Sequence, residues 1–228
     1  MRRTVALAAG AVLALGAGAP DPLRDASATR PSKEPDRVTL DLNAFRRVES
    51  GSGLAYYQLV EEDGAKFIRG DYRPGMETIT LAAQVPEEVR SKAKRLRWRW
   101  RVRALPDKAD ECRSGYTDSA AVVYVTFKRG LMWHVIKYVW STVGKLGATC
   151  DLKRTVLTSQ DTVILESGGP LDVWREEEID LSAAYLQHYE PKNPRASVPD
   201  LVGVAILTDG DQTRSAALSD YADFTVVY

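Results

Sequence analysis

Arg95-Leu96-Arg97-Trp98-Arg99-Trp100-Arg101-Val102-Arg103 is the stretch of sequence that decides the fold. Apolar and cationic side chains alternate along it, and this period of two predicts a β-strand with two chemically different faces. A helix would distribute both kinds of side chain around its circumference, so the alternation excludes a helix here. One face of the predicted strand carries two tryptophans, and the other face carries five arginines.

Further strand patterns recur along the chain, with turn residues between them. They cover residues 38–42, 54–60, 66–68, 79–85, 119–127, 133–140, 155–157, 163–165, 173–181, 201–207 and 221–227. One short helix is predicted over 182–188, with Ser182 as its N-cap. This pattern predicts an all-β fold over residues 37–228, a two-sheet antiparallel sandwich of jelly-roll type with one short helix.

The N-terminus has the layout of a secretory signal peptide. Arg2 and Arg3 precede an apolar run that ends in small residues, so residues 1–19 are expected to be the signal, with the cut point left open. An uncleaved membrane anchor is the alternative, and the shortness of the run argues against it. Residues 20–36 contain four prolines and are expected to form a disordered linker. We therefore expect an exported protein, periplasmic or secreted, without a transmembrane span in its mature form.

Charge and cysteine content narrow the possible partners. The chain has 31 basic and 31 acidic residues, so no overall field favours nucleic acid. Cys112 and Cys150 can pair in an oxidising compartment, and the alternative is two free thiols. A disulfide between them would stabilise the fold by about 3–4 kcal/mol in the chain-entropy model. Two cysteines without a nearby histidine cannot complete a tetrahedral zinc site.

The two faces of the arginine strand allow different interpretations. Trp98 and Trp100 are either core residues or a platform that stacks sugars, and their aliphatic neighbours favour the core. The arginines on the other face would repel one another unless carboxylates or an anionic ligand met them. Glu176, Glu178 and Asp180 alternate along a later strand and could oppose them as a ladder.

The functional alternative is a cationic groove for an acidic glycan or another anionic envelope polymer. The candidate ligand-binding residues are Arg97, Arg99, Arg101, Trp140, Trp174, Glu176 and Glu178.

Acidic residues near the C-terminus suggest a calcium site. Asp209 and Asp211 alternate in a loop, and Asp223 could complete the site if the following hairpin returned to it. The alternative is an Asp-rich turn in which the carboxylates accept hydrogen bonds from nearby backbone N–H groups, and this alternative is favoured. No cofactor is expected other than this calcium ion.

Catalytic signals are weak. Residues 176–178 are three glutamates that could supply a general acid with Asp223 as its partner, as glycoside hydrolysis requires. His134 and His188, the two histidines, have no nucleophile near them in the sequence. A glycan-cleaving enzyme is therefore the least favoured of the functions considered.

Several stretches taken together resemble a known family. They are residues 96–102, 118–127, 138–140, Trp174 with Asp180, residues 203–213 and residues 221–224. In this order they are similar to DUF3047, a family of exported bacterial proteins of unknown function. The resemblance implies a sandwich similar to carbohydrate-binding modules, with no agreed activity. We expect a non-catalytic module that binds a glycan or another envelope component, with a structural or protein-interaction module as the alternative.

Overall fold

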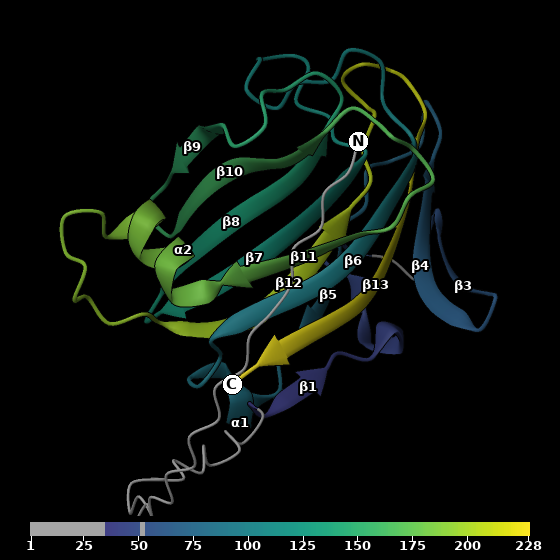
Figure 1. The fold of residues 1–228 in the computed structure, drawn as a ribbon. Helices are drawn as coiled ribbons and strands as arrows, with labels where there is room; N and C mark the ends of the chain where they lie inside the picture. The colour runs from purple at the N-terminus through teal and green to yellow at the C-terminus, as the bar shows by residue number, and fades with distance from the viewer. Residues whose placement is uncertain (1–34, 51–52) are drawn as a thin grey trace, which may run out of the picture. The chain divides into compact units, whose positions relative to one another are not determined.

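A computed structural model of the chain describes residues 35–50 and 53–228 (Figure 1). The predicted signal peptide and nearly all of the predicted linker lie outside the described residues. The described chain folds into two β-sheets. The first, sheet A, has the order β11-β6-β13-β4-β3, and β1 also pairs with β13. Its strands are β1 (Arg37–Thr39), β3 (Tyr57–Glu62), β4 (Ala65–Tyr72), β6 (Arg95–Ala104), β11 (Arg175–Asp180) and β13 (Ala217–Val227).

The second sheet, sheet B, has the order β2-β5-β12-β7-β8-β10-β9. Its strands are β2 (Arg46–Arg47), β5 (Leu81–Gln84), β7 (Ala121–Arg129), β8 (Met132–Ser141), β9 (Thr149–Arg154), β10 (Thr158–Ser167) and β12 (Asp200–Leu207). The predicted two-sheet sandwich is confirmed, with one difference: β10 pairs with β8 in parallel. The strand predicted over 155–157 is wrong, because these residues form the turn between β9 and β10.

Three short helices connect the strands in the part of the chain that the structure describes. They are the 3-10 helix η1 (Leu42–Ala44), α1 (Glu87–Arg90) and α2 (Leu181–Tyr189). The predicted helix is α2, but its cap is Asp180 rather than Ser182, because the Asp180 carboxylate accepts a hydrogen bond of 2.8 Å from the Ala183 N–H. No helix within residues 35–50 and 53–228 has the length and apolar character needed to cross a bilayer.

The arginine strand is β6, and its apolar face lies in the core. Trp98 and Trp100 are both fully buried. Across the sandwich, the Trp98 ring centroid lies 5.9 Å from that of Tyr138, and the Trp100 centroid lies 5.9 Å from that of Trp140. These aromatic contacts join sheet A to sheet B, so the assignment of the two tryptophans to the core is confirmed.

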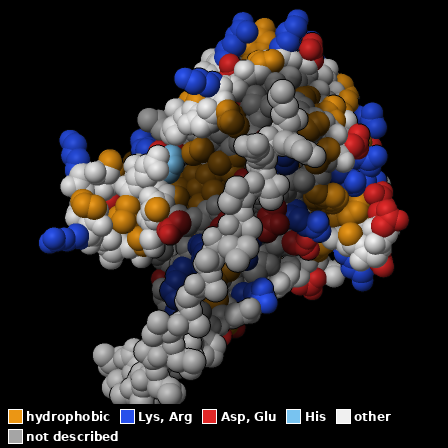
Figure 2. Space-filling model, viewed as in Figure 1, with side chains coloured by type: hydrophobic (Ala, Val, Ile, Leu, Met, Phe, Trp, Pro, Cys, Tyr) orange, Lys and Arg blue, Asp and Glu red, His pale blue; other side chains and the backbone are white. Residues whose placement is uncertain are grey.

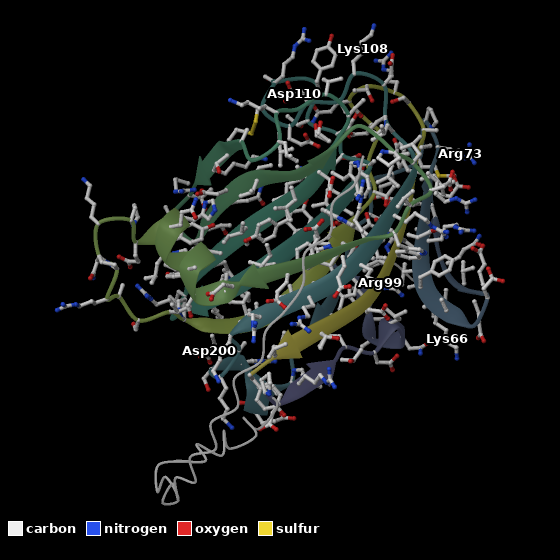
Figure 3. All side chains as sticks on the ribbon, viewed as in Figure 1. Lys66, Arg73, Arg99, Lys108, Asp110 and Asp200 are labelled. Carbon is white, nitrogen blue, oxygen red and sulfur yellow. A yellow bond between two sulfur atoms is a disulfide. The ribbon has the colours of Figure 1, made fainter. Side chains whose placement is uncertain are left out.

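The two cysteines form the disulfide Cys112–Cys150, with 5.4 Å between their Cα atoms (Figure 3). Cys112 lies in a turn before β7, and Cys150 lies in β9. The disulfide therefore ties the loop that precedes the central strand β7 to the edge strand of sheet B.

Candidate functional site

The outer face of β6, called the arginine face here, carries Arg95, Arg97, Arg99, Arg101 and Arg103, and carboxylates meet all five. Arg95 and Arg97 both pair with Glu178, whose strand β11 runs beside β6. Arg99 pairs with Asp223, and Arg103 Nε lies 2.7 Å from Asp172 Oδ1. Of the three carboxylates predicted to oppose the arginines, Glu178 does so, whereas Asp180 caps α2, and segments other than β11 supply the remaining partners. Figure 2 shows basic and acidic side chains interspersed on the side of the molecule where β3 and β4 lie.

A buried carboxylate, that of Asp220, lies at the centre of the ion pairs on the arginine face. Asp220 on β13 is fully buried between two arginines, with 2.7 Å to Arg69 Nε and 2.9 Å to Arg101 Nε. Glu62 on β3 also contacts both guanidinium groups, at 3.1 Å and 3.4 Å. Arg69 and then Arg101 lower the pKa of Glu62 through hydrogen bonds and charge. The arginines at this point stabilise sheet A by pairing with its own carboxylates.

Trp174, a predicted ligand residue, packs within the same network. The guanidinium carbons of Arg99 and Arg101 lie 5.1 Å and 4.8 Å from its ring centroid. Its ring also meets Phe67 edge-on, at 5.6 Å between centroids. Cation–π contacts of this kind are attractive and hold the ring in place. Protein side chains therefore already occupy much of the surface that a sugar would stack on.

Two hollows adjoin the arginine face and share the residues Thr39, Arg99 and Asp223. The larger has a volume of about 750 Å³ and extends to Lys66 on the β3–β4 hairpin (Figure 3). The smaller has a volume of about 330 Å³, and Glu176 lines it. Most of the predicted ligand residues thus gather on one face, but their charges are largely neutralised there.

Trp140 is a correction to the predicted site. Its side chain is 1% exposed, and its indole N–H donates a hydrogen bond of 2.8 Å to the Gly168 carbonyl oxygen. Trp140 lies on the inner face of β8, in a stretch that is buried from Ile136 to Ser141, and its ring packs against that of Trp100. A buried ring that packs between the sheets cannot stack a ligand.

The predicted calcium ligands do not all come together. A β-bulge in β13 puts Asp223 at φ +56° and directs it onto the arginine face, where it binds Arg99. Asp209 and Asp211 lie apart from it, on the loop between β12 and β13, whereas Asp223 lies well inside β13. Asp118, which the sequence did not single out, takes its place.

Asp118, Asp209 and Asp211 form an acidic cluster whose ligand oxygens lie within 4.8 Å of one another. Burial, and then the charges of Asp118 and Asp211, raise the pKa of Asp209 to about 6. One hydrogen bond is of the kind expected in an Asp-rich turn: Asp209 Oδ1 accepts from the Asp211 N–H at 3.3 Å. Two others join the cluster to distant residues: Asp118 Oδ2 accepts from the N–H of Thr213 at 2.7 Å, and Asp209 accepts from Thr78 Oγ1 at 3.1 Å. Calcium binding at the cluster stays a prediction.

The glutamates of β11 point to opposite sides. Glu178 faces the arginines, and Arg97 and Arg95 lower its pKa. Glu177 turns inward and accepts a hydrogen bond of 3.1 Å from the Trp100 indole N–H. Burial, the largest cause, raises the pKa of Glu177 to about 7, and the charge of Glu166 adds to the effect.

This contrast predicts opposite pH dependences for two neighbouring residues. Because the folded state raises the pKa of Glu177 above its ordinary 4.5, its contribution to stability is complete below pH 4.5 and is lost as the pH rises through about 7. Glu177→Gln should therefore raise the free energy of unfolding by about 1–2 kcal/mol at about pH 8, after allowance for solvent screening, and leave it unchanged at about pH 4. Urea unfolding across this pH range measures both values.

Glu178→Gln is the matched control. The folded state lowers the pKa of Glu178, so its contribution is present above its ordinary 4.5 and disappears as the pH falls through the lower folded value. This variant should be less stable than wild type at neutral pH and equal to it in acid. If the stability differences of the two variants from wild type changed with pH in the same direction, Glu177 and Glu178 would not lie in opposite electrostatic environments.

A second groove crosses the outer face of sheet B and is called the sheet B groove here. It has a volume of about 640 Å³ and runs over β2, β5, β12, β7 and β8, with α1 at its side. Small residues leave its floor low: Ala205 on β12 pairs with Ala82 on β5, and Gly203 lies two residues away on β12. Trp133 on β8 lines the groove and is 39% exposed. The groove thus offers an open path across the strands with an accessible aromatic ring.

The charges in this groove are of one sign. Its lining within the described chain includes four cations, Arg46, Arg47, Arg90 and Lys128, and no carboxylate. Arg46 donates to the backbone carbonyls of Asn43 and Phe45, and Arg90 donates to the Val85 carbonyl and the Gln84 amide oxygen.

The other two cations of the groove are also weakly neutralised. Lys128 lies over the Trp133 ring, with its Nζ 4.6 Å from the centroid. Arg47 lies 3.6 Å from Glu77, whose side chain is 76% exposed. Unlike the arginine face, the sheet B groove therefore keeps most of its positive charge available to a ligand.

The sequence reasoning missed the sheet B groove. Its residues come from segments that are far apart in the chain, and no single one forms a motif. One signal was present: Gly203 and Ala205 alternate along a predicted strand. Small side chains on one face of a strand leave that face of the sheet low, and another backbone or a ligand can approach it closely.

Comparisons with known proteins found one matching family model and several similar structures. The family model described as "Protein of unknown function (DUF3047)" matches residues 46–225, and no curated protein matches the sequence. The family 11 carbohydrate-binding module from Clostridium thermocellum is similar in structure, with 10% identity, coverage of 86% of this chain and 97% of that chain, and a TM-score of 0.44.

Endoglucanase 3 of Trichoderma harzianum, from family GH12, is another structural neighbour. Its identity is 8%, its TM-score is 0.42, and the match covers 87% of this chain and 99% of that chain. Similarities at this level do not transfer a function, so the functional argument depends on the side chains of this chain.

Proposed function

We propose that this chain, which belongs to the DUF3047 family of proteins of unknown function, is a non-catalytic exported module that binds an anionic glycan in the sheet B groove. The observation that carries the proposal is the groove itself. It is open, lined by four cations without a carboxylate among the described lining residues, and presents the half-exposed ring of Trp133.

The aromatic and the basic side chains of the groove would contact different parts of a glycan. The apolar face of a sugar ring can stack on the indole of Trp133, while carboxylate or phosphate groups of the glycan accept hydrogen bonds from Arg46, Arg90 and Lys128. Arginine suits this task because its planar fork binds carboxylates and phosphates through two donors. The small residues on the floor leave room for the chain of the polymer.

The location outside the cytoplasm is part of the proposal. The signal-like N-terminus predicts export, and the disulfide Cys112–Cys150 supports it because disulfides persist mainly in oxidising compartments. Polymers of the cell envelope are then the anionic glycans within reach.

Titration of polygalacturonate, with dextran as the neutral counterpart, tests the proposal. Trp133→Ala and Lys128→Gln should each raise the Kd for polygalacturonate by about tenfold, because one removes the stacking ring and the other a charged donor. Binding should weaken as the salt concentration rises. Isothermal titration calorimetry gives the Kd, and an assay of reducing ends should detect no cleavage.

An Arg97→Gln/Arg99→Gln variant locates the ligand. Because carboxylates pair with both arginines, this variant should bind polygalacturonate as wild type does. Loss of binding in this variant alone would place the ligand on the arginine face. If wild type bound neither polymer, a structural or protein-interaction role would replace the glycan proposal.

A further inference from the structure

Two hairpin turns at one end of sheet B expose the most accessible large apolar side chains of the described chain. Leu131, between β7 and β8, is 79% exposed, and Val156, between β9 and β10, is 88% exposed. Leu157 beside Val156 is 51% exposed. Isolated exposed apolar residues need no explanation, but a cluster on neighbouring turns does.

The two turns are neighbours in space. β8 and β10 run parallel, so both strands begin at the same end of the sheet, and Trp133 pairs with Thr158 there. A backbone hydrogen bond of 2.8 Å from the Trp133 N–H to the Leu157 carbonyl oxygen joins the two hairpins directly. The exposed aliphatic side chains therefore project from one continuous edge, called the basic hairpin tips here.

Both turns repeat one sequence pattern, Lys-Arg-x-aliphatic. It reads Lys128-Arg129-Gly130-Leu131 in the first and Lys153-Arg154-Thr155-Val156 in the second. The arginines anchor the tips, because Arg129 Nη1 lies 2.9 Å from Glu190 and Arg154 pairs with Asp161. The pattern thus fixes an aliphatic side chain beyond a pair of basic residues at each tip.

The surroundings of the tips are basic. Residues 128–133, 153–158 and 189–200 contain six basic and two acidic residues. Figure 2 shows Lys and Arg side chains projecting at this end of the molecule, around the loop that follows α2. The other end differs: Val143 and Leu146 are exposed there, but the adjoining loop 105–118 carries four acidic and two basic residues. Of these two ends of sheet B, the one with the tips combines exposed apolar groups with an excess of positive charge.

We propose that the basic hairpin tips dock on an anionic lipid bilayer, with Leu131, Val156 and Leu157 entering the interface between headgroups and acyl chains. Partial burial of apolar side chains supplies the hydrophobic part of the binding, and the excess of basic over acidic residues around the tips is attracted to anionic headgroups, while Arg129 and Arg154 serve as anchors. Hydrogen bonds and ion pairs hold both hairpins in place, so less conformational entropy is lost on docking than for an unanchored loop. This surface shares Lys128 with the sheet B groove, but Leu131, Val156 and Leu157 do not line the groove, so variants of these apolar residues test the docking separately from the glycan proposal.

Sedimentation with vesicles of phosphatidylglycerol and phosphatidylcholine, against vesicles of phosphatidylcholine alone, tests this docking. The full chain should bind the anionic vesicles more tightly, and added salt should weaken the binding. Leu131→Ser/Val156→Ser should lower the partition coefficient by about tenfold or more, since two apolar side chains leave the interface. Both residues are exposed, so folding should not change, and binding of polygalacturonate should equal that of wild type.

Val143→Ser/Leu146→Ser is the matched control at the opposite end and should partition as wild type does. Equal loss in both variants, or equal binding of wild type to both kinds of vesicle, would overturn the proposal. Sedimentation velocity without lipid tests a second copy as the occupant. A dimer that dissociates in Leu131→Ser/Val156→Ser would show that the tips cover one another, and would also overturn docking on lipid.

Discussion

Asp220→Asn should lower the free energy of unfolding by about 3 kcal/mol, the low end for loss of one partner from a buried ion pair. Asp220 is fully buried and contacts both Arg69 and Arg101, so its neutralisation leaves two mostly buried guanidinium groups to share Glu62. Arg69 is 18% exposed and Arg101 is 15% exposed, and water can replace little of the lost contact. Denaturant unfolding at neutral pH measures the loss.

Asp223→Asn is the control for this prediction. Asp223 pairs with Arg99 on the same face, but its side chain is 56% exposed, so the loss should stay below about 1 kcal/mol. Asparagine also tolerates the positive φ of this position. Similar small losses in both variants would mean that the arginine network is solvated and contributes little to stability.

Removal of the disulfide should have the largest effect on stability. Cys112→Ser/Cys150→Ser opens a loop of 38 residues, and the chain-entropy model assigns about 4 kcal/mol to a closure of this length. The loop contains β7 and β8, two central strands of sheet B that line part of the groove. Without the disulfide, this segment has more conformational entropy in the unfolded chain. Urea unfolding of the variant and of the oxidised wild type gives the difference.

A reducing agent provides the internal check. It should bring the stability of the wild type down to that of the double serine variant and leave the variant unchanged. A decrease of less than about 1 kcal/mol in the free energy of unfolding of the wild type on reduction would contradict the entropic explanation. Residual structure in the reduced unfolded chain would then account for the small effect.

Basic residues have different roles on the arginine face and in the sheet B groove. On sheet A, carboxylates from β3, β11 and β13 and from Asp172 neutralise the arginines and make the face structural. On sheet B, the cations mostly meet backbone carbonyls, an amide and a ring, so their charge remains for a ligand. This difference, rather than the number of arginines, is why the proposed glycan site lies on sheet B.

The sequence by itself determined the local features of this protein. The alternation in residues 95–103 predicted both the strand and the burial of Trp98 and Trp100, because adjacent residues of a strand face opposite sides and water excludes one set. The sandwich class followed from strand and turn patterns. These properties are encoded by residues close together in the chain.

Only the tertiary structure decided which distant residues meet. Glu178 was expected near the arginines, but Asp220, Glu62 and Asp172 were not, and Asp118 replaced Asp223 in the acidic cluster. A register shift of one residue would turn each side chain to the other face, and the bulge beside Asp223 does this locally. The sheet B groove depends in the same way on the register of several strands. Pairings of this kind are set by the packing of the whole sandwich, and no local pattern contains them.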